Sequence, residues 1–280
     1  MDPLVTVSGL HWKYVGSSRE ALSGIDFELM PGEVLGVTGP SGAGKTTLAM
    51  SIDSLIPNNF HGEFGGSVMI RGKNTAEFSV CDLVREVGLV FQDPESQFMG
   101  MTVEEELVFT LENLGLSDEE ITRRVNHAIR MVHMEDFLDR SPFSLSGGQK
   151  QKVAIASCLA LEPSILVLDE PTSELDPIGT TEVFSVLQEL KKDRQIGIIL
   201  ISHATEDLAS FCDRILLLSE GQQICLRETQ AFFSDVELLK KYGVQIPQIV
   251  EVFNALPGID RKRIPITLPQ AVELYTECGK

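Results

Sequence analysis

Residues 39–47 constrain the fold of this chain more than any other stretch. They are Gly39, Pro40, Ser41, Gly42, Ala43, Gly44, Lys45, Thr46 and Thr47, and they fit the pattern G-x-x-x-x-G-K-[ST]. A strand is predicted before them, over Glu33 to Thr38, and a helix after them, over Thr47 to Leu55. In this setting backbone N–H groups turn inward around a phosphate, and the helix dipole adds to the attraction. We therefore predict an α/β fold built around a nucleotide-binding loop.

Two side chains of this loop indicate nucleotide chemistry. Lys45 would reach the terminal phosphates, and Thr46 would place its hydroxyl on Mg²⁺. A glycine-rich turn without a ligand is the alternative, but it does not require Lys and Thr at these positions. The loop predicts a bound nucleotide without saying what the nucleotide is used for.

The composition narrows the possible classes of protein. The chain has 280 residues, of which 43% are hydrophobic, which is room for one large α/β domain or a core with subdomains. A net charge of −18 disfavours a nucleic-acid partner. No apolar run approaches the roughly 18–20 residues that span a bilayer, and the N-terminus lacks a signal-peptide pattern. We therefore expect any membrane role to come through a partner.

The five cysteines are far apart and form no C-x-x-C pair. A disulfide framework or a zinc site is not supported by this spacing, and a reducing cytosol is the expected compartment.

Polar side chains follow two apolar runs. Gln92 comes directly after a strand predicted to end at Phe91, and the run from Ile165 ends in Asp169 and Glu170. Uninterrupted apolar strands suit a parallel sheet buried on both faces, and ligands bind at the carboxyl ends of such strands. Asp169 would help to hold Mg²⁺, Gln92 could contact the metal or a water, and Glu170 would act as general base on the attacking water. Alternatively, one of the carboxylates merely caps the next turn.

His203 follows a further apolar strand, predicted over Gly197 to Ser202. It could hydrogen-bond a terminal phosphate and the water. An isolated histidine is more often structural, but its place at the end of a strand favours the functional interpretation.

Residues Leu145 to Gln149 read LSGGQ and lead into a helix predicted to run to Leu161. Ser146 offers a hydroxyl, and the glycines offer open N–H groups, to an anion. Lys150 and Lys152 lie in the first turn, where cations are unfavourable, and a bound phosphate would relieve that. A plain serine N-cap is the alternative.

The remaining segments predict the surroundings of this site. Strands are predicted at Leu4 to Val7, Ile25 to Leu29 and Ser67 to Ile70, a hairpin at residues 214–226, and a turn-rich connection at Ile56 to Gly66. Capping boxes are predicted at Thr102 with Glu105 and at Ser117 with Glu120, and an N-cap at Asp176 before Pro177. Tyr14 could stack on an adenine or be a half-buried strand residue, and Trp12 is a competing candidate.

After about residue 230 the composition shifts. Ser234 with Glu237 predicts the start of a short helix, Pro247 and Pro269 could each open another, and residues 261–263 form a small basic patch.

Together these segments resemble the ATP-binding-cassette (ABC) ATPases. The matching motifs are, in order, residues 39–46 (Walker A), Gln92 (Q-loop), 145–149 (signature), 165–170 (Walker B), 173–176 (D-loop) and His203 (H-loop). The resemblance implies a P-loop NTPase (RecA-like) core in residues 1–230, with an N-terminal antiparallel β-subdomain and a helical subdomain at about 93–160. Kinases and GTPases share the phosphate loop but lack LSGGQ before the Walker B strand.

The resemblance also implies partners and roles. Two cassettes would dimerise head to tail around two ATP molecules with Mg²⁺. Ser146, Gly147, Gly148 and Gln149 would contact ATP bound to the other subunit, Tyr14 would stack on adenine, and Asp176 would lie at the dimer seam. A groove near Gln92 would receive a coupling helix of an integral membrane transport protein, which implies a peripheral ATPase on the cytoplasmic face of the cell membrane.

A narrower resemblance is to the ATP-binding subunits of energy-coupling-factor (ECF) and cobalt-type transporters, which import vitamins or transition-metal ions. It is carried by Val90 to Gln97, Thr102 to Glu106 and Leu145 to Ala156. Residues 231–280 are similar to the C-terminal dimerisation extension of that group. Glu174 and Ala204 depart from the usual D-loop and H-loop residues, which leaves open whether both ATP sites are equally active. The alternatives are a soluble ABC-type ATPase of an assembly complex and a non-catalytic nucleotide sensor, although the intact Glu170 and His203 argue against the sensor.

Overall fold

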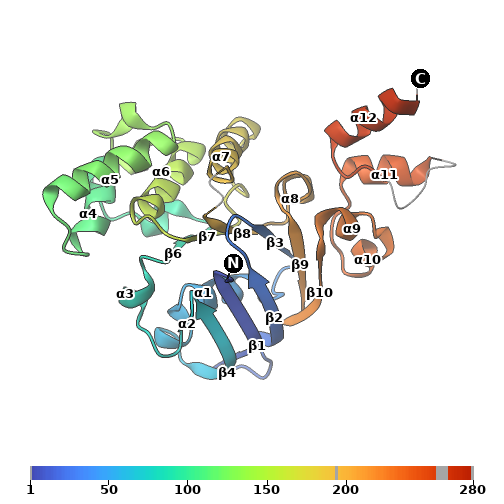
Figure 1. Cartoon of the computed structure of the whole chain (residues 1–280), viewed down its shortest axis with the longest axis horizontal. Coiled ribbons are helices and arrows are strands. Elements are labelled where there is room, and N and C mark those ends of the chain that lie inside the picture. Colours follow the sequence, from blue (N-terminus) through green and yellow to red (C-terminus); the bar gives the residue numbers. More distant parts are fainter. Residues whose placement is uncertain (1, 193–194, 257–263, 279–280) are drawn as a thin grey trace.

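The computed structural model describes residues 2–192, 195–256 and 264–278. A twisted sheet forms the body of the molecule, a helical subdomain lies against one side of it, and a smaller helical extension projects on the opposite side (Figure 1). The sheet has ten strands in the order β5-β4-β1-β2-β10-β9-β3-β8-β7-β6. Among the described residues, no helix is long and apolar enough to cross a membrane.

Five parallel strands form the half of the sheet that carries the phosphate loop. They are β9 (Arg214–Ser219), β3 (Val34–Thr38), β8 (Gly197–Ile201), β7 (Ile165–Asp169) and β6 (Val87–Val90). Every residue of β3, β6, β7 and β8 is buried. Helices pack on both faces, which is why these strands read as continuous apolar runs. The loop after β3 leads into α1 (Lys45–Ile52), which starts two residues before the predicted helix.

The antiparallel half contains β1 (Val5–Tyr14), β2 (Leu22–Leu29), β4 (Gly62–Ile70) and the short β5 (Lys73–Asn74). β10 (Gln222–Glu228) lies between β2 and β9 and pairs in parallel with β2. β10 also forms the predicted hairpin with β9. The predicted connection at Ile56 to Gly66 was wrong over most of its length. It contains the short helix α2 (Leu55–Asn58), and its last residues belong to β4, where Gly62 pairs with Tyr14. A Cβ at Gly62 would lie 2.6 Å from the Trp12 ring, so the glycine is needed for this pairing.

The helical subdomain consists of η1 (Pro94–Gln97), α4 (Val103–Glu112), α5 (Asp118–Met131), η2 (Glu135–Phe137), η3 (Pro142–Ser144) and α6 (Gly147–Ala160). Thr102 and Ser117 cap α4 and α5 as predicted. The reciprocal half of each predicted capping box is missing. Glu105 accepts from Met101 N instead. Glu120 pairs with Arg123 and Arg124 of its own helix, whose guanidinium groups bind the carboxylate more strongly than a backbone N–H would.

Asp176 caps α7 (Pro177–Leu190) as predicted, accepting from Gly179 N at 2.7 Å. Besides α2, two helices that lie outside this subdomain and before the C-terminal extension were missed. α3 (Val80–Leu83) precedes β6, and α8 (Thr205–Phe211) follows His203 directly. Both are too short for a helical period to stand out in the sequence.

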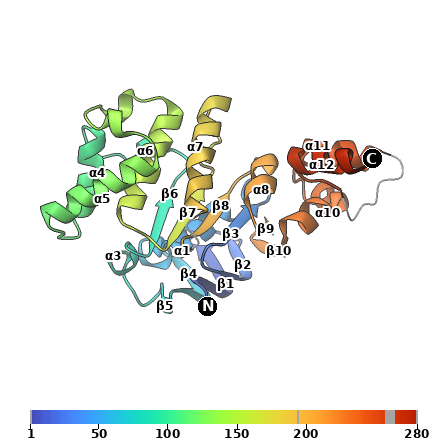
Figure 2. The same ribbon diagram turned by 45° about the horizontal axis from the view of Figure 1, so that its top comes forward.

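The extension contains α9 (Thr229–Phe233), α10 (Val236–Lys241), α11 (Gln248–Ala255) and α12 (Leu268–Cys278). Asp235, not the predicted Ser234, caps α10, because its carboxylate accepts from Leu238 N at 3.0 Å. Pro247 precedes α11, and Pro269 lies in the first turn of α12, as predicted. The basic patch at residues 261–263 lies outside the described residues. Figure 2 shows α11 and α12 lying together, away from the sheet.

Candidate functional site

The carboxyl ends of four adjacent parallel strands surround a cavity of about 700 Å³. The strand order β3-β8-β7-β6 places the phosphate loop, His203, the Asp169–Glu170 pair and Gln92 at one edge of the sheet. Eight predicted site residues line this cavity: Ser41, Gly42, Lys45, Thr46, Gln92, Asp169, Glu170 and His203. The sheet thus gathers residues that are up to 162 positions apart (203 − 41) in the sequence.

Two glycines of the phosphate loop are required by its backbone. Gly39 has φ +144°, and a Cβ there would lie 1.9 Å from Leu218 O. Gly44 has φ +100°, and a Cβ there would lie 2.4 Å from Ala21 O. A side chain at either position would both strain the backbone and collide with a neighbouring strand or loop. The loop conformation is therefore held by the antiparallel half of the sheet and by β9.

Lys45 is buried at the centre of the site. Its Nζ donates to Gly39 O at 3.0 Å and to Pro40 O at 3.2 Å, and it lies 3.0 Å from His203 Nε2. Burial lowers the pKa of Lys45, and burial, followed by the neighbouring ammonium, lowers the pKa of His203. A neutral His203 accepts from Lys45 through Nε2. These donors are positioned for an anion, and an incoming phosphate would compete with the contacts between them.

Glu170 sits directly after β7 in a left-handed conformation with φ +51°. Its N–H donates to Ile201 O at 2.9 Å, which fixes the residue on the neighbouring strand. One carboxylate oxygen accepts from His203 N at 3.3 Å. The other lies 3.3 Å from His203 Nε2, outside hydrogen-bond geometry, and is buried without a hydrogen-bond partner among the described residues.

Burial raises the pKa of Glu170. A carboxylate with a raised pKa and a free acceptor oxygen, on a residue with a strained backbone, suits a base that takes a proton from water.

The oxygen donors expected of a magnesium site lie beside this carboxylate. The Thr46 hydroxyl donates to the buried Asp169 carboxylate, and the Gln92 side chain lines the same cavity. Burial raises the pKa of Asp169. Hydroxyl, carboxylate and amide oxygens are the hard ligands that Mg²⁺ takes alongside phosphate oxygens. The residues present therefore fit this ion.

Tyr14 and Trp12, the two aromatic candidates, have different environments. Trp12 is fully buried and packs edge-on against Tyr14 and Phe64, so it belongs to the core. Tyr14 is half-buried, and its hydroxyl lies 3.2 Å from Thr47 Oγ1, just behind the phosphate loop. Of the two, only Tyr14 has ring surface to offer a nucleotide.

The LSGGQ segment lies apart from this cavity, because none of its residues is among the cavity's lining. Ser146 and Gly147 are exposed at the start of α6. Ser146 and Gln149 form a reciprocal capping box, in which Ser146 N donates to Gln149 Oε1 at 3.1 Å and the Ser146 hydroxyl oxygen accepts from Gln149 N at 3.4 Å. The hydroxyl proton of Ser146 is still available for donation.

Lys150 and Lys152, near the start of α6, have protein partners. Lys150 pairs with Glu95 of η1 at 2.6 Å, and Lys152 pairs with Glu182 of α7 at 3.3 Å. Two carboxylates of neighbouring elements therefore offset the lysine charges that a bound phosphate was expected to relieve. Gly148 is buried, and a Cβ there would lie 2.8 Å from Gly179 Cα, so this glycine also allows α6 and α7 to pack closely.

The family model for ABC transporters matches residues 22–173. The chain belongs to the ABC transporter family. It is 42% identical over 263 residues to an ABC transporter ATP-binding protein of Pyrococcus abyssi, covering 93% of this chain and 94% of that one. It is 37% identical to the energy-coupling factor transporter ATP-binding protein EcfA of Pediococcus pentosaceus, covering 91% and 90%.

Solved ABC structures agree with the fold. CbiO1 of Clostridium perfringens, part of the ABC transporter complex CbiONQ, superimposes with a TM-score of 0.76 at 31% identity, covering 91% of this chain and all of that one. The cassette MJ0796 superimposes with a TM-score of 0.69 at 26% identity, covering 80% and 98%, and its structures are a dimer and a post-hydrolysis state bound to ADP and phosphate. The chain is thus the ATP-binding subunit of an ABC transporter, and it hydrolyses ATP to ADP and phosphate.

Several cavity residues of this ABC subunit were not predicted as site residues. They are Thr172, Ser173, Thr180, Ser202, Ala204, Asp207 and Gln245. Ser202 and Ala204 flank His203, and Thr172 and Ser173 follow Glu170, so proximity to a predicted residue was a usable signal. Gln245 belongs to the extension, and no pattern in the sequence connects it to the phosphate loop.

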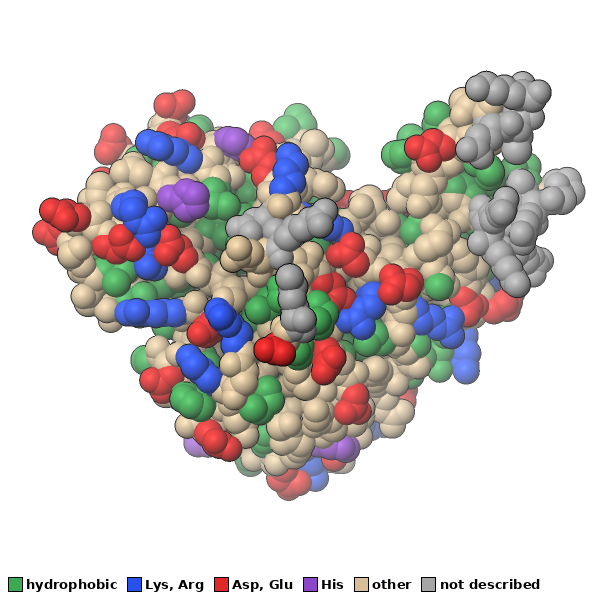
Figure 3. All heavy atoms as spheres, viewed as in Figure 1, with side chains coloured by type: hydrophobic (Ala, Val, Ile, Leu, Met, Phe, Trp, Pro, Cys, Tyr) green, Lys and Arg blue, Asp and Glu red, His purple; other side chains and the backbone are tan. Residues whose placement is uncertain are grey.

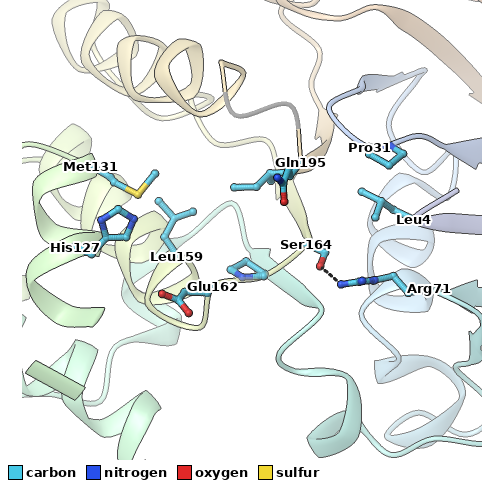
Figure 4. A pocket seen from close by; sticks show the side chains of 11 residues that line it. Leu4, Pro31, Arg71, His127, Met131, Leu159, Glu162, Ser164 and Gln195 are labelled. Atoms are coloured by element: carbon cyan, nitrogen blue, oxygen red, sulfur yellow. Dashed lines mark hydrogen bonds between the residues drawn. The ribbon is translucent and has the colours of Figure 1, made fainter. Parts of the chain in front are cut away.

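A second cavity, of about 520 Å³, lies at the opposite edge of the cassette, between the helical subdomain and the amino ends of the strands. Figure 4 shows His127 and Met131 on one side of it and Leu4 and Arg71 on the other. Its charged groups bond to the protein itself, since Arg71 donates to Ser164 Oγ at 2.9 Å and Glu162 accepts from two arginines of α5. In the part of the chain that the structure describes, the charged groups of this second cavity therefore do not converge as the donors of the first cavity do.

Proposed function

We propose that this chain is the ATP-hydrolysing subunit of an ABC importer of the energy-coupling-factor type. It would power the uptake of a vitamin or a transition-metal ion through a membrane partner. The observation that carries the catalytic part is that His203 Nε2 lies 3.0 Å from Lys45 Nζ and 3.3 Å from a Glu170 carboxylate oxygen, with all three residues lining one cavity. The similarity to EcfA and CbiO1 supports the transporter type.

On this proposal the phosphate loop binds the triphosphate of ATP through its backbone N–H groups, and Lys45 binds the terminal phosphates. Thr46, Asp169 and Gln92 would hold Mg²⁺, which neutralises phosphate charge when bound. Tyr14 would lie against the adenine. The half-buried ring beside Thr47 supports this role, because that residue belongs to the loop that would hold the phosphates.

For hydrolysis, the free oxygen of Glu170 would accept a proton from the attacking water, and the raised pKa of this carboxylate favours that transfer. His203, neutral at its lowered pKa, would hydrogen-bond the terminal phosphate and keep Glu170 in place through its backbone N–H. Lys45 would stabilise the charge that builds on the phosphoryl oxygens.

We further propose that Ser146, Gly147, Gly148 and Gln149 act on ATP bound to a second subunit. The exposure of Ser146 and Gly147, and their separation from the cavity of their own chain, support this arrangement. The amino end of α6 and the free hydroxyl proton of Ser146 are suited to a phosphate. Asp176, which caps the helix next to α6, would lie near the seam.

The membrane partner would dock beside η1. Met99 and Met101 are 73% and 80% exposed, and Phe143 packs edge-on against Phe98 while remaining half-exposed. Exposed methionines adapt to an apolar partner surface. We expect Met101→Asp to weaken binding of the membrane subunit and Met101→Leu to preserve it, with ATP affinity unchanged in both.

The extension, residues 231–280, would contribute to dimerisation. Leu268, Val272 and Tyr275 form one exposed apolar stripe along α12, and Val252 and Leu256 are exposed on α11. Such a stripe on a soluble surface indicates an interaction site. Tyr275→Glu should reduce the nucleotide-independent dimer fraction in light scattering.

A pull-down in mild detergent tests the transport role. Copies of the chain carrying Glu170→Gln would be isolated with ATP, and the co-purifying proteins identified. The proposal predicts an integral membrane protein whose retention is lost with Met101→Asp. A stable complex with soluble proteins alone would instead support the assembly ATPase. Uptake by vesicles containing the recovered complex would then separate vitamins from metal ions.

A further inference from the structure

The extension contacts the nucleotide cavity of its own chain. α8 starts immediately after His203 and Ala204, and Figure 1 places it between the sheet and the extension. Glu206 of α8 is exposed, and its carboxylate accepts from Gln248 N at 3.2 Å. Gln248 is the first residue of α11, which has no side-chain cap of its own because Pro247 precedes it. A carboxylate of the nucleotide region thus caps a helix of the extension.

The chain just before α11 reaches the cavity itself. Gln245 lines it together with His203 and Asp207. Val244 and Pro247 on either side of this glutamine are buried, and Val244 N donates to Leu239 O at 2.9 Å. The segment 244–248 is therefore anchored by the extension on one side and by Glu206 on the other. Figure 3 shows the surface hollowed where the extension meets the body.

We propose that residues 244–248 couple the position of the extension to the occupancy of the ATP site, with Glu206 as the link and Gln245 as a positioning residue. The inference rests on the proposed nucleotide site. To that site it adds a series of contacts that runs from His203 through α8 to α11, in the extension that carries the exposed apolar stripe.

The path follows from contacts that already exist. Lys45 and His203 lie 3.0 Å apart, so a terminal phosphate that binds both changes their arrangement. His203 is joined to α8 by a single residue, and Thr205 at the start of α8 is fully buried, so a shift of His203 is carried into the helix. Glu206 would then move the first turn of α11. Because coupling is reciprocal, dimerisation of the extension would in turn change ATP affinity.

Hydrogen–deuterium exchange on the full chain tests this path. Glu170→Gln would be used throughout to hold ATP, and the exchange of residues 248–255 compared with and without ATP. We expect ATP to change the exchange of this segment. Glu206→Ala should abolish the change. Glu206→Gln should preserve it, because its amide oxygen still accepts from Gln248 N. Glu251→Gln changes an exposed acid of α11 itself, which forms no hydrogen bond or ion pair with α8 among the described residues, and serves as the control for the Glu206 variants.

Gln245→Ala provides a kinetic test in the otherwise unchanged chain. The phosphate loop is untouched, so the chain should still bind ATP, while kcat falls about 5-fold or more because His203 beside Gln245 is misplaced. Gln245→Glu should not rescue it, since a carboxylate would add charge beside Asp207. A merely structural role for Gln245 would change thermal stability and leave kcat unaffected.

Two results would overturn the coupling. In one, ATP binds to the Glu170→Gln chain but leaves the exchange of residues 248–255 unchanged. In the other, Glu206→Ala responds to ATP as strongly as Glu206→Gln. If the Glu170→Gln chain fails to bind ATP in a titration, the proposed nucleotide site itself is wrong and the coupling falls with it.

Discussion

The phosphate-loop end and the signature end of this cassette are built in different ways. The phosphate-loop end is assembled from the ends of four strands. Lys45 and Asp169 are buried there, and short contacts link Lys45, His203 and Glu170. The signature end is the start of a single helix, exposed and satisfied by its own capping box. The phosphate-loop end forms only when the strands of the sheet have assembled, whereas the signature end requires only the start of one helix.

This difference explains why one chain can bind ATP but should hydrolyse it poorly. The cavity has donors for phosphate and an acceptor for water, all from one chain. It has no contribution from Ser146 to Gln149 of that chain. If the signature completes the site of a second copy, the two ends must respond differently to substitution and to the mixing of chains that carry different substitutions. The following experiments test that contrast, from the largest expected effect to the smallest.

Glu170→Gln should abolish most hydrolysis and leave ATP binding intact. Loss of a general base lowers turnover by about 10²- to 10⁴-fold, and an amide cannot take the proton from water. ATP should then hold the dimer closed, which size-exclusion chromatography with and without ATP would reveal. Phosphate release measures turnover, and Glu63→Gln on the exposed edge of β4 is the control. Unchanged turnover would remove Glu170 from the role of base.

Lys45→Ala should weaken ATP binding about 10- to 100-fold, because a charge-assisted contact of roughly 1.5–3 kcal/mol is lost. A nucleotide titration with the isolated chain measures it. Lys240→Ala removes an equally charged but exposed side chain of α10 and should leave the affinity unchanged. Equal affinities for Lys45→Ala and Lys240→Ala would contradict the placement of the phosphates.

Ser146→Asp should leave ATP binding by a single chain intact and suppress hydrolysis by the dimer. Aspartate caps a helix as well as serine does, but its charge repels a phosphate. Mixing this chain with Lys45→Ala should restore part of the hydrolysis, because one composite site then has an intact loop and an intact signature. Mixing it with a chain that carries both substitutions should not. A signature acting within its own chain would give no restoration in either mixture.

Asp207→Asn should stabilise the protein more at high pH than at low pH. Burial, helped by the neighbouring Glu206, raises the pKa of Asp207 from 3.8 to about 6. The folded state therefore holds this proton more tightly than the unfolded state, and wild-type stability falls as the pH rises through that range. The variant should gain less than about 1 kcal/mol, because solvent screens a partly exposed group. Thermal unfolding at about pH 5 and about pH 7.5 would show the difference, and equal gains would contradict it.

Lys150→Ala and Glu95→Ala should each destabilise the fold slightly. Their pair at 2.6 Å offsets an unfavourable cation at the start of α6. A double-mutant cycle in urea should give a coupling of at most about 1 kcal/mol, since Glu95 is half-exposed. A coupling of zero would mean that the signature helix needs no support from η1.

The sequence predicted most of the parallel core and the candidate site, because each strand there ends in a distinctive motif. It failed where structure depends on pairing or distance. The start of β4 at Gly62 requires β1 beside it. The partners of Lys150 and Lys152 come from η1 and α7, which no local pattern links to α6. Gln245 reaches the cavity only because the extension folds back over α8.

The amino-acid sequence by itself determined the residues that we propose to bind a triphosphate, since the spacing of glycines, Lys45 and Thr46 is local and follows from backbone geometry. It also determined the buried parallel strands through their continuous apolar runs. Only the tertiary structure decided which of these residues meet. The strand order brings His203 between the phosphate loop and Glu170, and it keeps Ser146 apart from them. Hydrogen bonding between distant strands sets that order, and no stretch of sequence contains it.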